Sequence, residues 1–360
     1  MNLKSFLYTL GTLAVVMTCL PLLPLDAWWI RMFDFPHVQL TVFTLIALVS
    51  FVTKFKIDDW KEYVFVGALI SCFIYQGIKV YPYTPTASLE VMDSSKPQKN
   101  QVLKLYTANV LQKNKHYDTI NQQIHTLKPD IILLTETDKK WRNAIVSQLP
   151  SDYKYRKEAP LDNTYGMVLY SKLELKNPET HFLVNDSIPS MSSEVKLPDG
   201  SWIQLYTIHP TPPMPQENPM STDRDAEMMI VAEKCRNSKL PVVVLGDFND
   251  VAWSKTTNLF QRTGELLDLR KGRGFYCSYD ANNMIFRWPL DHLFISDEFR
   301  LKKVMLCDKT GSDHFPFYTE LTYEPNLAHE QTPEPPTELE LKQANDQIKR
   351  LRKKRPIANN

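Results

Sequence analysis

Residues 242–250, VVVLGDFND, end a hydrophobic run with two carboxylates and an amide beside a glycine. Asp247 and Asn249 are two positions apart, and side chains with this spacing share a face of an extended chain. We therefore expect the pair to act on one bound group where a buried strand ends.

Other polar side chains follow strand-like runs elsewhere in the chain. They are Asn109 after LKLYTA, Glu136 after IILLT, His209 after IQLYTI, Asp291 within RWPLDHLF, and Asp313 with His314 in GSDHFPF. A single Asp or Asn after a strand is commonly a turn former, and a single His is commonly a structural residue. The joint occurrence favours a pocket at one edge of a sheet.

The residue types limit the chemistry of such a pocket. Glu136, with one or more of Asn109, Asp247 and Asp313, offers hard oxygen ligands that suit Mg²⁺ or Mn²⁺, and thiolate ligands are missing. A hard divalent cation indicates a phosphate-containing substrate. A transition-metal hydrolase using histidine ligands is disfavoured, because the sequence has no HxH or HxxxH pair at these positions.

The remaining groups fit hydrolysis of a phosphate ester. His209 and His314 can donate hydrogen bonds to phosphoryl oxygens when protonated. Asp247 could orient or deprotonate an attacking water, and Asn249 could hold transition-state oxygens.

The elements that must position these residues alternate β-rich runs with helical patterns. We expect strands over 101–109, 129–138, 166–173, 182–186, 192–198, 202–210, 241–250, 289–296 and 317–323, and helices over 116–127, 139–149 and 223–238. Continuously apolar strands must be covered on both faces, which predicts a layered α/β sandwich.

The N-terminal region has the composition of a membrane anchor. Residues 6–25 carry no charge and can cross a hydrocarbon core of about 30 Å. Residues 38–53 and 63–78 are shorter apolar stretches with aromatic flanks. We expect three membrane helices within residues 1–83. Buried helices of a soluble domain are the alternative for the shorter two; a cleaved signal peptide is disfavoured because no A-x-A-like site follows.

The basic residues predict the orientation of this anchor. Lys4 and the loop lysines 54, 56 and 61 would share the cytoplasmic face, which leaves Arg31 in the first outer loop. Three crossings in the inner or plasma membrane then place the catalytic domain in the periplasm or outside the cell; an even number of crossings would invert this orientation. We expect a linker over 84–100, the catalytic domain over 101–323, and a Pro-rich linker with a basic C-terminal helix or tail over 324–360.

Composition limits the partners. The formal net charge of +1 argues against a surface built to coat nucleic acid, and five cysteines without a pairing or CxxC pattern predict free thiols. No obligate protein partner is inferred.

In the tail, Thr337 and Glu340 form a capping box that predicts a short helix, whose basic end could contact anionic lipid; a solvated, frayed end is the alternative.

The chain resembles the endonuclease/exonuclease/phosphatase superfamily, the DNase I-like fold, from about residue 102 to 321. GDFND and GSDHFP are similar to its most specific motifs, and TAN, LLTET, YTIHP and PLDHLF add support. The resemblance implies a four-layer α/β sandwich with two central mixed sheets, preceded here by the three membrane helices.

The resemblance also implies roles for individual residues. Glu136 would be the principal Mg²⁺ ligand with Asn109 and Asp313 nearby, Asp247 would position the water, and Asn249 would support the developing charge. His209 and His314 would contact the phosphate, with His314 oriented by Asp291. Arg224 falls where membrane-anchored members carry an arginine close to the pocket, so it would bind substrate phosphate; a position on a surface helix is the alternative.

One departure from the DNA-cleaving members bears on the substrate. Residues 210–220, PTPPMPQENPM, are Pro-rich and nearly uncharged, whereas abasic-site nucleases have basic, aromatic loops there. Together with a bilayer anchor, this favours a lipid-linked phosphate or pyrophosphate. An endonuclease or exonuclease on extracellular DNA and a catalytically silent envelope binding module remain alternatives, and the loop could be a plain Pro-stiffened connection.

Overall fold

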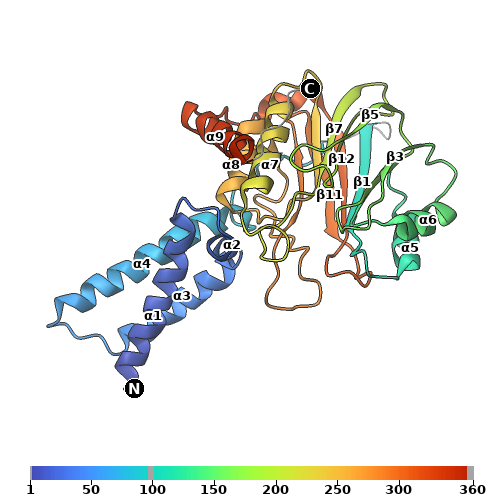
Figure 1. The fold of residues 1–360 in the computed structure, drawn as a ribbon. Helices are drawn as coiled ribbons and strands as arrows, with labels where there is room; N and C mark the ends of the chain where they lie inside the picture. The colour runs from blue at the N-terminus through green and yellow to red at the C-terminus, as the bar shows by residue number, and fades with distance from the viewer. Residues whose placement is uncertain (1, 96–100, 355–360) are drawn as a thin grey trace.

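The computed structural model describes residues 2–95 and 101–354 and shows a helical bundle joined to a larger α/β domain (Figure 1). The last five residues of the predicted linker and the last six of the predicted tail lie outside the described residues. All five cysteines lie among the described residues and are free, as predicted.

The bundle consists of α1 (Leu3–Cys19), α3 (His37–Val52) and α4 (Trp60–Val80), with the short helices η1 (Leu20–Leu22), α2 (Trp28–Arg31), η2 (Met32–Asp34) and η3 (Tyr81–Tyr83) at the end near the α/β domain. Among the described residues, Leu3–Leu22 and Trp60–Tyr83 are long and apolar enough to cross a membrane. Trp28–Asp34 with His37–Val52, bent by 76°, would add a third crossing if the pair is one span. The predicted third span therefore depends on this bent pair.

The outer surface of the bundle is apolar. Val42, Val49 and Ile74 are 55%, 58% and 54% exposed, so α3 and α4 are not buried helices of the α/β domain. Inside the bundle, Gln76 Nε2 donates to Thr18 Oγ1 (2.6 Å) and to Thr44 Oγ1 (3.0 Å). Hydrogen bonds of this kind between polar side chains hold helices together when their outward-facing side chains are apolar.

The α/β domain contains two six-stranded mixed sheets. The first has the order β11-β12-β1-β2-β4-β3, formed by Phe299–Leu306, Phe317–Tyr323, Val102–Asn109, Ile131–Thr135, Met167–Ser171 and Tyr155–Ala159. The second has the order β5-β6-β7-β8-β10-β9, formed by Leu175–His181, Ser190–Lys196, Trp202–Ile208, Val242–Asp247, Asp291–Ile295 and Leu267–Asp268. The β1–β2 and β7–β8 pairs are parallel, and the other named pairs are antiparallel.

The helices complete four layers. Leu105, Leu133 and Leu205 belong to the apolar core between the sheets. Helices α5 (Tyr117–Leu127) and α6 (Lys139–Gln148) cover the outer face of the first sheet, and α7 (Thr222–Arg236), α8 (Lys255–Gly264) and α9 (Glu338–Lys354) cover the second. The predicted two-sheet α/β fold is confirmed.

Some sequence-based boundaries were wrong. Residues 182–186 are not a strand; the strand β5 lies just before them, at Leu175–His181. This edge strand is polar, contains Pro178, and changes register between Lys176 and Glu179, so it lacks the apolar alternation of a paired strand. In 182–186, Asn185 instead closes a turn by accepting from Ser187 N (3.1 Å).

The C-terminal helix forms and packs on the domain. Thr337 N donates to Glu340 Oε2 (2.7 Å) and Glu340 N donates to Thr337 Oγ1 (3.2 Å), which confirms the capping box. Ala344, Ile348 and Leu351 are buried against α7 and its neighbours. The chain is therefore not frayed up to residue 354, although the basic residues Lys349, Arg350, Arg352 and Lys353 are exposed to solvent.

Candidate active site

The predicted site residues lie at one edge shared by the two sheets. Asn109 ends β1, Glu136 follows β2, His209 follows β7, Asp247 ends β8, Asp291 begins β10 and His314 precedes β12. The two parallel pairs end side by side, and Asp291 is the register partner of Asp247. The topology therefore brings together residues that are far apart in sequence.

A tight turn after β8 positions Asp247 and Asn249. Gly246 has a φ of +149°, and a Cβ atom there would lie 2.0 Å from the carbonyl oxygen of Ile208, so only glycine fits. Asn249 has a φ of +50°, donates its backbone N–H to Asp247 Oδ1 (3.0 Å), and donates Nδ2 to Pro210 O (2.9 Å). Asp247 and Asn249 do line the same cavity, but through a turn and not through the extended chain that we expected.

Asp247 is the meeting point of the site. Its Oδ2 atom accepts from Asn109 Nδ2 (3.0 Å) and lies 3.6 Å from His314 Nε2 and 3.8 Å from His209 Nε2. Asp247 is 1% exposed. A buried carboxylate held between an amide and two imidazoles can orient a small polar molecule such as water.

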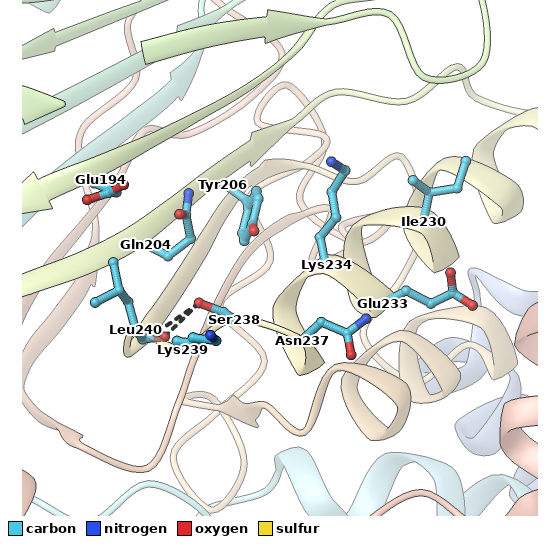
Figure 2. A pocket seen from close by; sticks show the side chains of 10 residues that line it. All are labelled: Glu194, Gln204, Tyr206, Ile230, Glu233, Lys234, Asn237, Ser238, Lys239 and Leu240. Carbon is cyan, nitrogen blue, oxygen red and sulfur yellow. Dashed lines mark hydrogen bonds between the residues drawn. The ribbon is translucent and has the colours of Figure 1, made fainter. Parts of the chain in front are cut away.

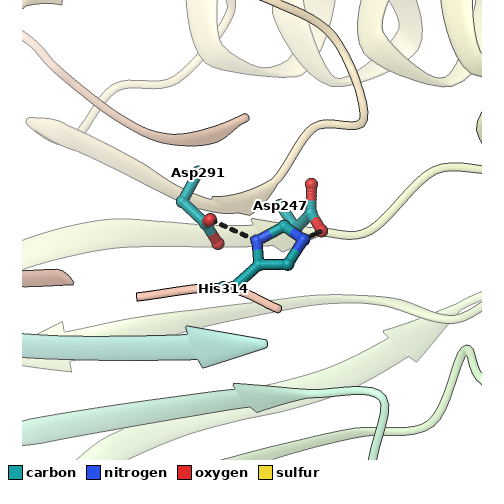
Figure 3. A group of neighbouring side chains, drawn as sticks. All are labelled: Asp247, Asp291 and His314. Atoms are coloured by element: carbon teal, nitrogen blue, oxygen red, sulfur yellow. Dashed lines mark hydrogen bonds and ion pairs between the residues drawn. The ribbon is translucent and has the colours of Figure 1, made fainter. Parts of the chain in front are cut away.

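His314 lies between two carboxylates (Figure 3). Its Nδ1 atom is 2.7 Å from Asp291 Oδ2, and its Nε2 atom faces Asp247. Burial alone would lower the pKa of His314, but the charges of Asp291 and Asp247 outweigh it and raise the pKa to about 10. His314 is therefore a cation at neutral pH and presents its Nε2–H toward the cavity edge.

Glu136 faces the same centre from the first sheet. Its Oε1 atom accepts from Asn109 Nδ2 (2.8 Å), and its backbone adopts a φ of +59°, a strained conformation for a residue with a side chain. Desolvation raises the pKa of Glu136, and the charge of Asp247 adds to this effect. Two partly desolvated carboxylates that share one amide are a donor set that a hard divalent cation would stabilise.

A second group could also hold a metal. One ligand atom each from Asp247, Asp291 and His314 lie within 4.8 Å of one another. In this group the imidazole is already bonded to Asp291 and positively charged, which opposes a cation beside it. The donor set around Glu136 therefore fits Mg²⁺ or Mn²⁺ better.

These residues open into a cavity of about 920 Å³. Glu136, His209, Asp247, Asn249, Asp313 and His314 are among the residues that line it. Asn109 and Asp291 lie directly behind this lining, bonded to Glu136 and His314. The cavity thus gathers eight of the nine residues predicted from the sequence.

Arg224 is placed differently from the prediction. It is only 2% exposed and is not part of the cavity lining. Its NH1 donates to Asn249 O (2.9 Å), and its Nε and NH2 donate to Asp225 Oδ1 (3.0 and 2.9 Å), with Asp250 Oδ1 at 3.3 Å. It supports the turn after β8 from behind, so neither a contact with substrate phosphate nor a surface position fits its surroundings.

Sequence reasoning missed the aromatic residues of the cavity. The Tyr165 ring lies 5.4 Å from that of His209, and the Tyr279 ring lies 5.0 Å from that of His314. Tyr165 also donates to Glu217 Oε2 (3.0 Å), a residue of the Pro-rich loop. These tyrosines lie in irregular segments without a periodic pattern, so nothing in one sequence distinguishes them.

Another hollow lies beside the C-terminal end of α7 (Figure 2). It measures about 610 Å³ and is lined by residues of β6, β7 and α7, including Glu194, Tyr206 and Lys234. None of the predicted site residues lines it, and we assign it no role.

Comparison with known proteins agrees with the fold. A two-sheet α/β domain with carboxylates and histidines at one sheet edge is the general design of phosphoester hydrolases of the DNase I-like class. The model of the Endonuclease/Exonuclease/phosphatase family matches residues 106–314, more than half of the chain, and the chain belongs to this family. Members of this family typically hydrolyse phosphoester bonds and usually depend on a divalent metal.

Solved structures share the fold at low sequence identity. A humanized D. rerio TDP2 carrying 14 mutations is 16% identical with a TM-score of 0.53, covering 62% of this chain and 99% of its own. An endonuclease/exonuclease/phosphatase family protein from Bacteroides thetaiotaomicron is 18% identical with a TM-score of 0.52, covering 65% and 98%. A functionally unknown conserved protein from Enterococcus faecalis V583 is 13% identical with a TM-score of 0.51, covering 62% and 100%. No curated protein matches the sequence.

Proposed function

We propose that this protein is a membrane-anchored, divalent-metal-dependent phosphoesterase that hydrolyses a lipid-linked phosphate or pyrophosphate by in-line attack of water. One observation carries the proposal. The cavity that holds Glu136, Asp247 and His314 is also lined by residues of the apolar N-terminal bundle, such as Met17 and Met32. A substrate in this cavity would meet a phosphate-type site and an apolar wall together.

Each polar residue has a role in this reaction. Asp247 orients the attacking water and accepts its proton, because its Oδ2 faces the cavity between His209 and His314. The two imidazoles bind phosphoryl oxygens, and Asp291 keeps His314 protonated and correctly turned. The side-chain amide of Asn249 donates a hydrogen bond that stabilises the negative charge developing on the phosphoryl group.

Glu136, with Asp313, would hold the metal ion, and Mg²⁺ or Mn²⁺ suits these carboxylate oxygens. Asn109 was expected near the metal, but its Oδ1 accepts from Leu111 N, so it would position the carboxylates and not ligate the ion. When bound, such an ion neutralises charge on the phosphoryl group and polarises its P–O bonds. Asn109 keeps Glu136 and Asp247 at a fixed separation, since its Nδ2 donates to both carboxylates.

The charges around the cavity argue against the nuclease alternative. Among the lining residues, Lys113 is the sole lysine or arginine, whereas Glu136, Glu217, Asp247 and Asp313 are acidic. Binding of DNA depends on several cationic contacts to successive phosphates. The Pro-rich loop, which contributes Pro212–Glu217 to the lining, supplies no cation either.

The catalytically silent alternative is disfavoured for a different reason. A binding module has no need for a cationic His314 paired with Asp291, nor for the strained backbone of Glu136.

The proposed location is a cell inner membrane or plasma membrane. With α1, α3 and α4 as three crossings, the N-terminus and the catalytic domain would lie on opposite sides, with the domain in the periplasm or outside the cell.

The experiment is a substrate screen on the purified full-length protein in detergent. Plasmid DNA, soluble phosphodiesters and phosphomonoesters, and a long-chain prenyl pyrophosphate are incubated with Mg²⁺, Mn²⁺ or EDTA, and the screen is repeated on Glu136→Ala and His314→Ala. We expect metal-dependent release of phosphate from the lipid and at least a 100-fold loss in both variants. DNA nicking without lipid turnover, or full turnover in either variant, would refute the proposal.

A further inference from the structure

We infer that the apolar half of the active-site cavity binds the hydrocarbon chain of the substrate, and that residues 28–36 of the N-terminal region form one wall of this chain site. The inference rests on the proposed function, because it takes the phosphate head to be bound at Asp247 and His314. It adds that the membrane anchor selects the substrate and is itself part of the active site.

The cavity has two chemically different ends. The polar end contains the carboxylates and imidazoles described above. The apolar end is lined by Met17, Trp28, Met32, Phe33 and Phe35 from the N-terminal region, facing Met214, Phe286, Trp288 and Leu290 from the catalytic domain. Among these five N-terminal side chains, only the indole of Trp28 can form a conventional hydrogen bond.

A row of aromatic rings connects the two ends. The ring of Tyr279 lies 5.0 Å from that of His314 and is stacked on Trp288, with centroids 6.1 Å apart and planes 24° apart. Trp288 in turn meets Phe35 edge to face at 5.7 Å. An extended molecule whose head lies at His314 would therefore follow a continuous apolar surface to the N-terminal segment.

The N-terminal wall is fixed to the catalytic domain by hydrogen bonds at both of its ends. Ser221 N donates to Asp26 O (2.8 Å) and Trp28 N donates to Pro219 O (2.9 Å), so the segment is bound to the end of the Pro-rich loop. At the other end, Trp253 Nε1 donates to Asp34 O (2.8 Å). The wall therefore has a defined place beside the catalytic centre.

The chemistry of this end selects a hydrocarbon chain. A sugar or nucleotide loses hydrogen bonds to water when it binds and needs several partners in the protein to replace them. The N-terminal wall offers almost none. Met32 is 49% exposed, so a chain that covers it removes apolar surface from water. Met17 belongs to α1, one of the helices able to cross a membrane, so a chain leaving this end would continue along the bundle toward the bilayer.

The test compares two substrates with the same head group on the full-length protein in detergent with Mg²⁺. They are a long-chain prenyl pyrophosphate and the short, water-soluble dimethylallyl pyrophosphate. Wild-type protein should have a higher kcat/KM for the long chain, and Met32→Gln, which keeps the side-chain length, should lower the long-to-short ratio about tenfold. Phe33→Ala is a second, independent variant. Leu25→Ala, an exposed residue of the same region outside the cavity lining, should leave the ratio unchanged.

The outcomes separate the inference from the proposed function. Equal kcat/KM values for the two substrates in the wild type, or an unchanged ratio in both Met32→Gln and Phe33→Ala, would overturn the chain site while leaving a phosphoesterase intact. Loss of the ratio in Leu25→Ala as well would also overturn it, because the effect would then be general. If neither pyrophosphate nor any soluble phosphoester is hydrolysed, the proposed function fails and the chain site fails with it.

Discussion

His314 and Asp291 form a buried ion pair at the edge of the two sheets, with Nδ1 and Oδ2 2.7 Å apart. The pair comes from two different sheets, since Asp291 begins β10 and His314 precedes β12. It fixes both the charge and the direction of the imidazole, which leaves Nε2 facing Asp247.

Replacing the acidic partner should impair turnover more than folding. Asp291→Asn keeps the shape but removes the charge that holds His314 protonated, so kcat for a phosphoester should fall about 100-fold. Asp308→Asn, at an exposed position, is the matched control. Steady-state kinetics check this, and a variant with wild-type kcat would show that the pair has no catalytic role.

Gly246 should be intolerant of any side chain. The Cβ atom of Gly246→Ala would meet Ile208 O, so we expect a loss of about 3 kcal/mol in the free energy of unfolding. Gly200 also has a positive φ (+94°), but nothing lies within 4 Å of the Cβ atom that Gly200→Ala would add, so this change should cost only about 1 kcal/mol. Chemical denaturation compares the two, and equal losses would mean that the close approach to Ile208 is unimportant.

Arg224 tests a position where prediction and structure differ. Arg224→Ala would leave the buried carboxylates of Asp225 and Asp250 without their cation, which should cost about 3 kcal/mol of stability and disorder the Asn249 turn. The matched control is Arg236→Ala at the end of the same helix. A variant with unchanged thermal stability and a raised KM alone would instead support direct contact with substrate phosphate.

Glu227 should make the stability of the protein depend on pH. It is buried in α7, both carboxylate oxygens lack a hydrogen-bond partner among the described residues, and burial, with a further contribution from Asp223, raises its pKa from 4.5 to about 8. The free energy of unfolding is therefore highest below pH 4.5 and decreases as the pH rises to about 8. In this pH range Glu227 is ionised in the unfolded chain but still protonated in the folded protein. The total loss is roughly 5 kcal/mol.

Glu227→Gln removes this ionisation and should be more stable than the wild type at pH 8, with little difference at pH 4.5. Unfolding in denaturant at both pH values measures the effect, and Glu233→Gln on the same helix is the control. An identical pH dependence in wild type and Glu227→Gln would contradict this assignment.

The sequence was sufficient to predict which residues form the site where a residue's role follows from its chemical type and its place next to a strand. Asp247, Glu136 and His314 could be assigned to one site because buried apolar runs precede or follow each of them. Their fine geometry could not be predicted, since the turn at Asn249 is held by a hydrogen bond to Pro210 O, in a segment far away in the sequence.

Contacts between distant segments explain the rest. Arg224 has a sequence context typical of a surface helix, and only the docking of α7 against the β8 turn buries it. Likewise, an aromatic-rich segment such as 28–36 predicts contact with a membrane interface, but no pattern in it shows that Met32 and Phe33 line the catalytic cavity.

Hydrolysis of a long-chain prenyl pyrophosphate by the full-length protein, with and without Mg²⁺ and in the wild type and Glu136→Ala, is the most direct test of this account. We expect phosphate release that needs the metal and that falls at least 100-fold in the variant. Phosphate release that persists in EDTA, or that is unchanged in Glu136→Ala, would contradict it.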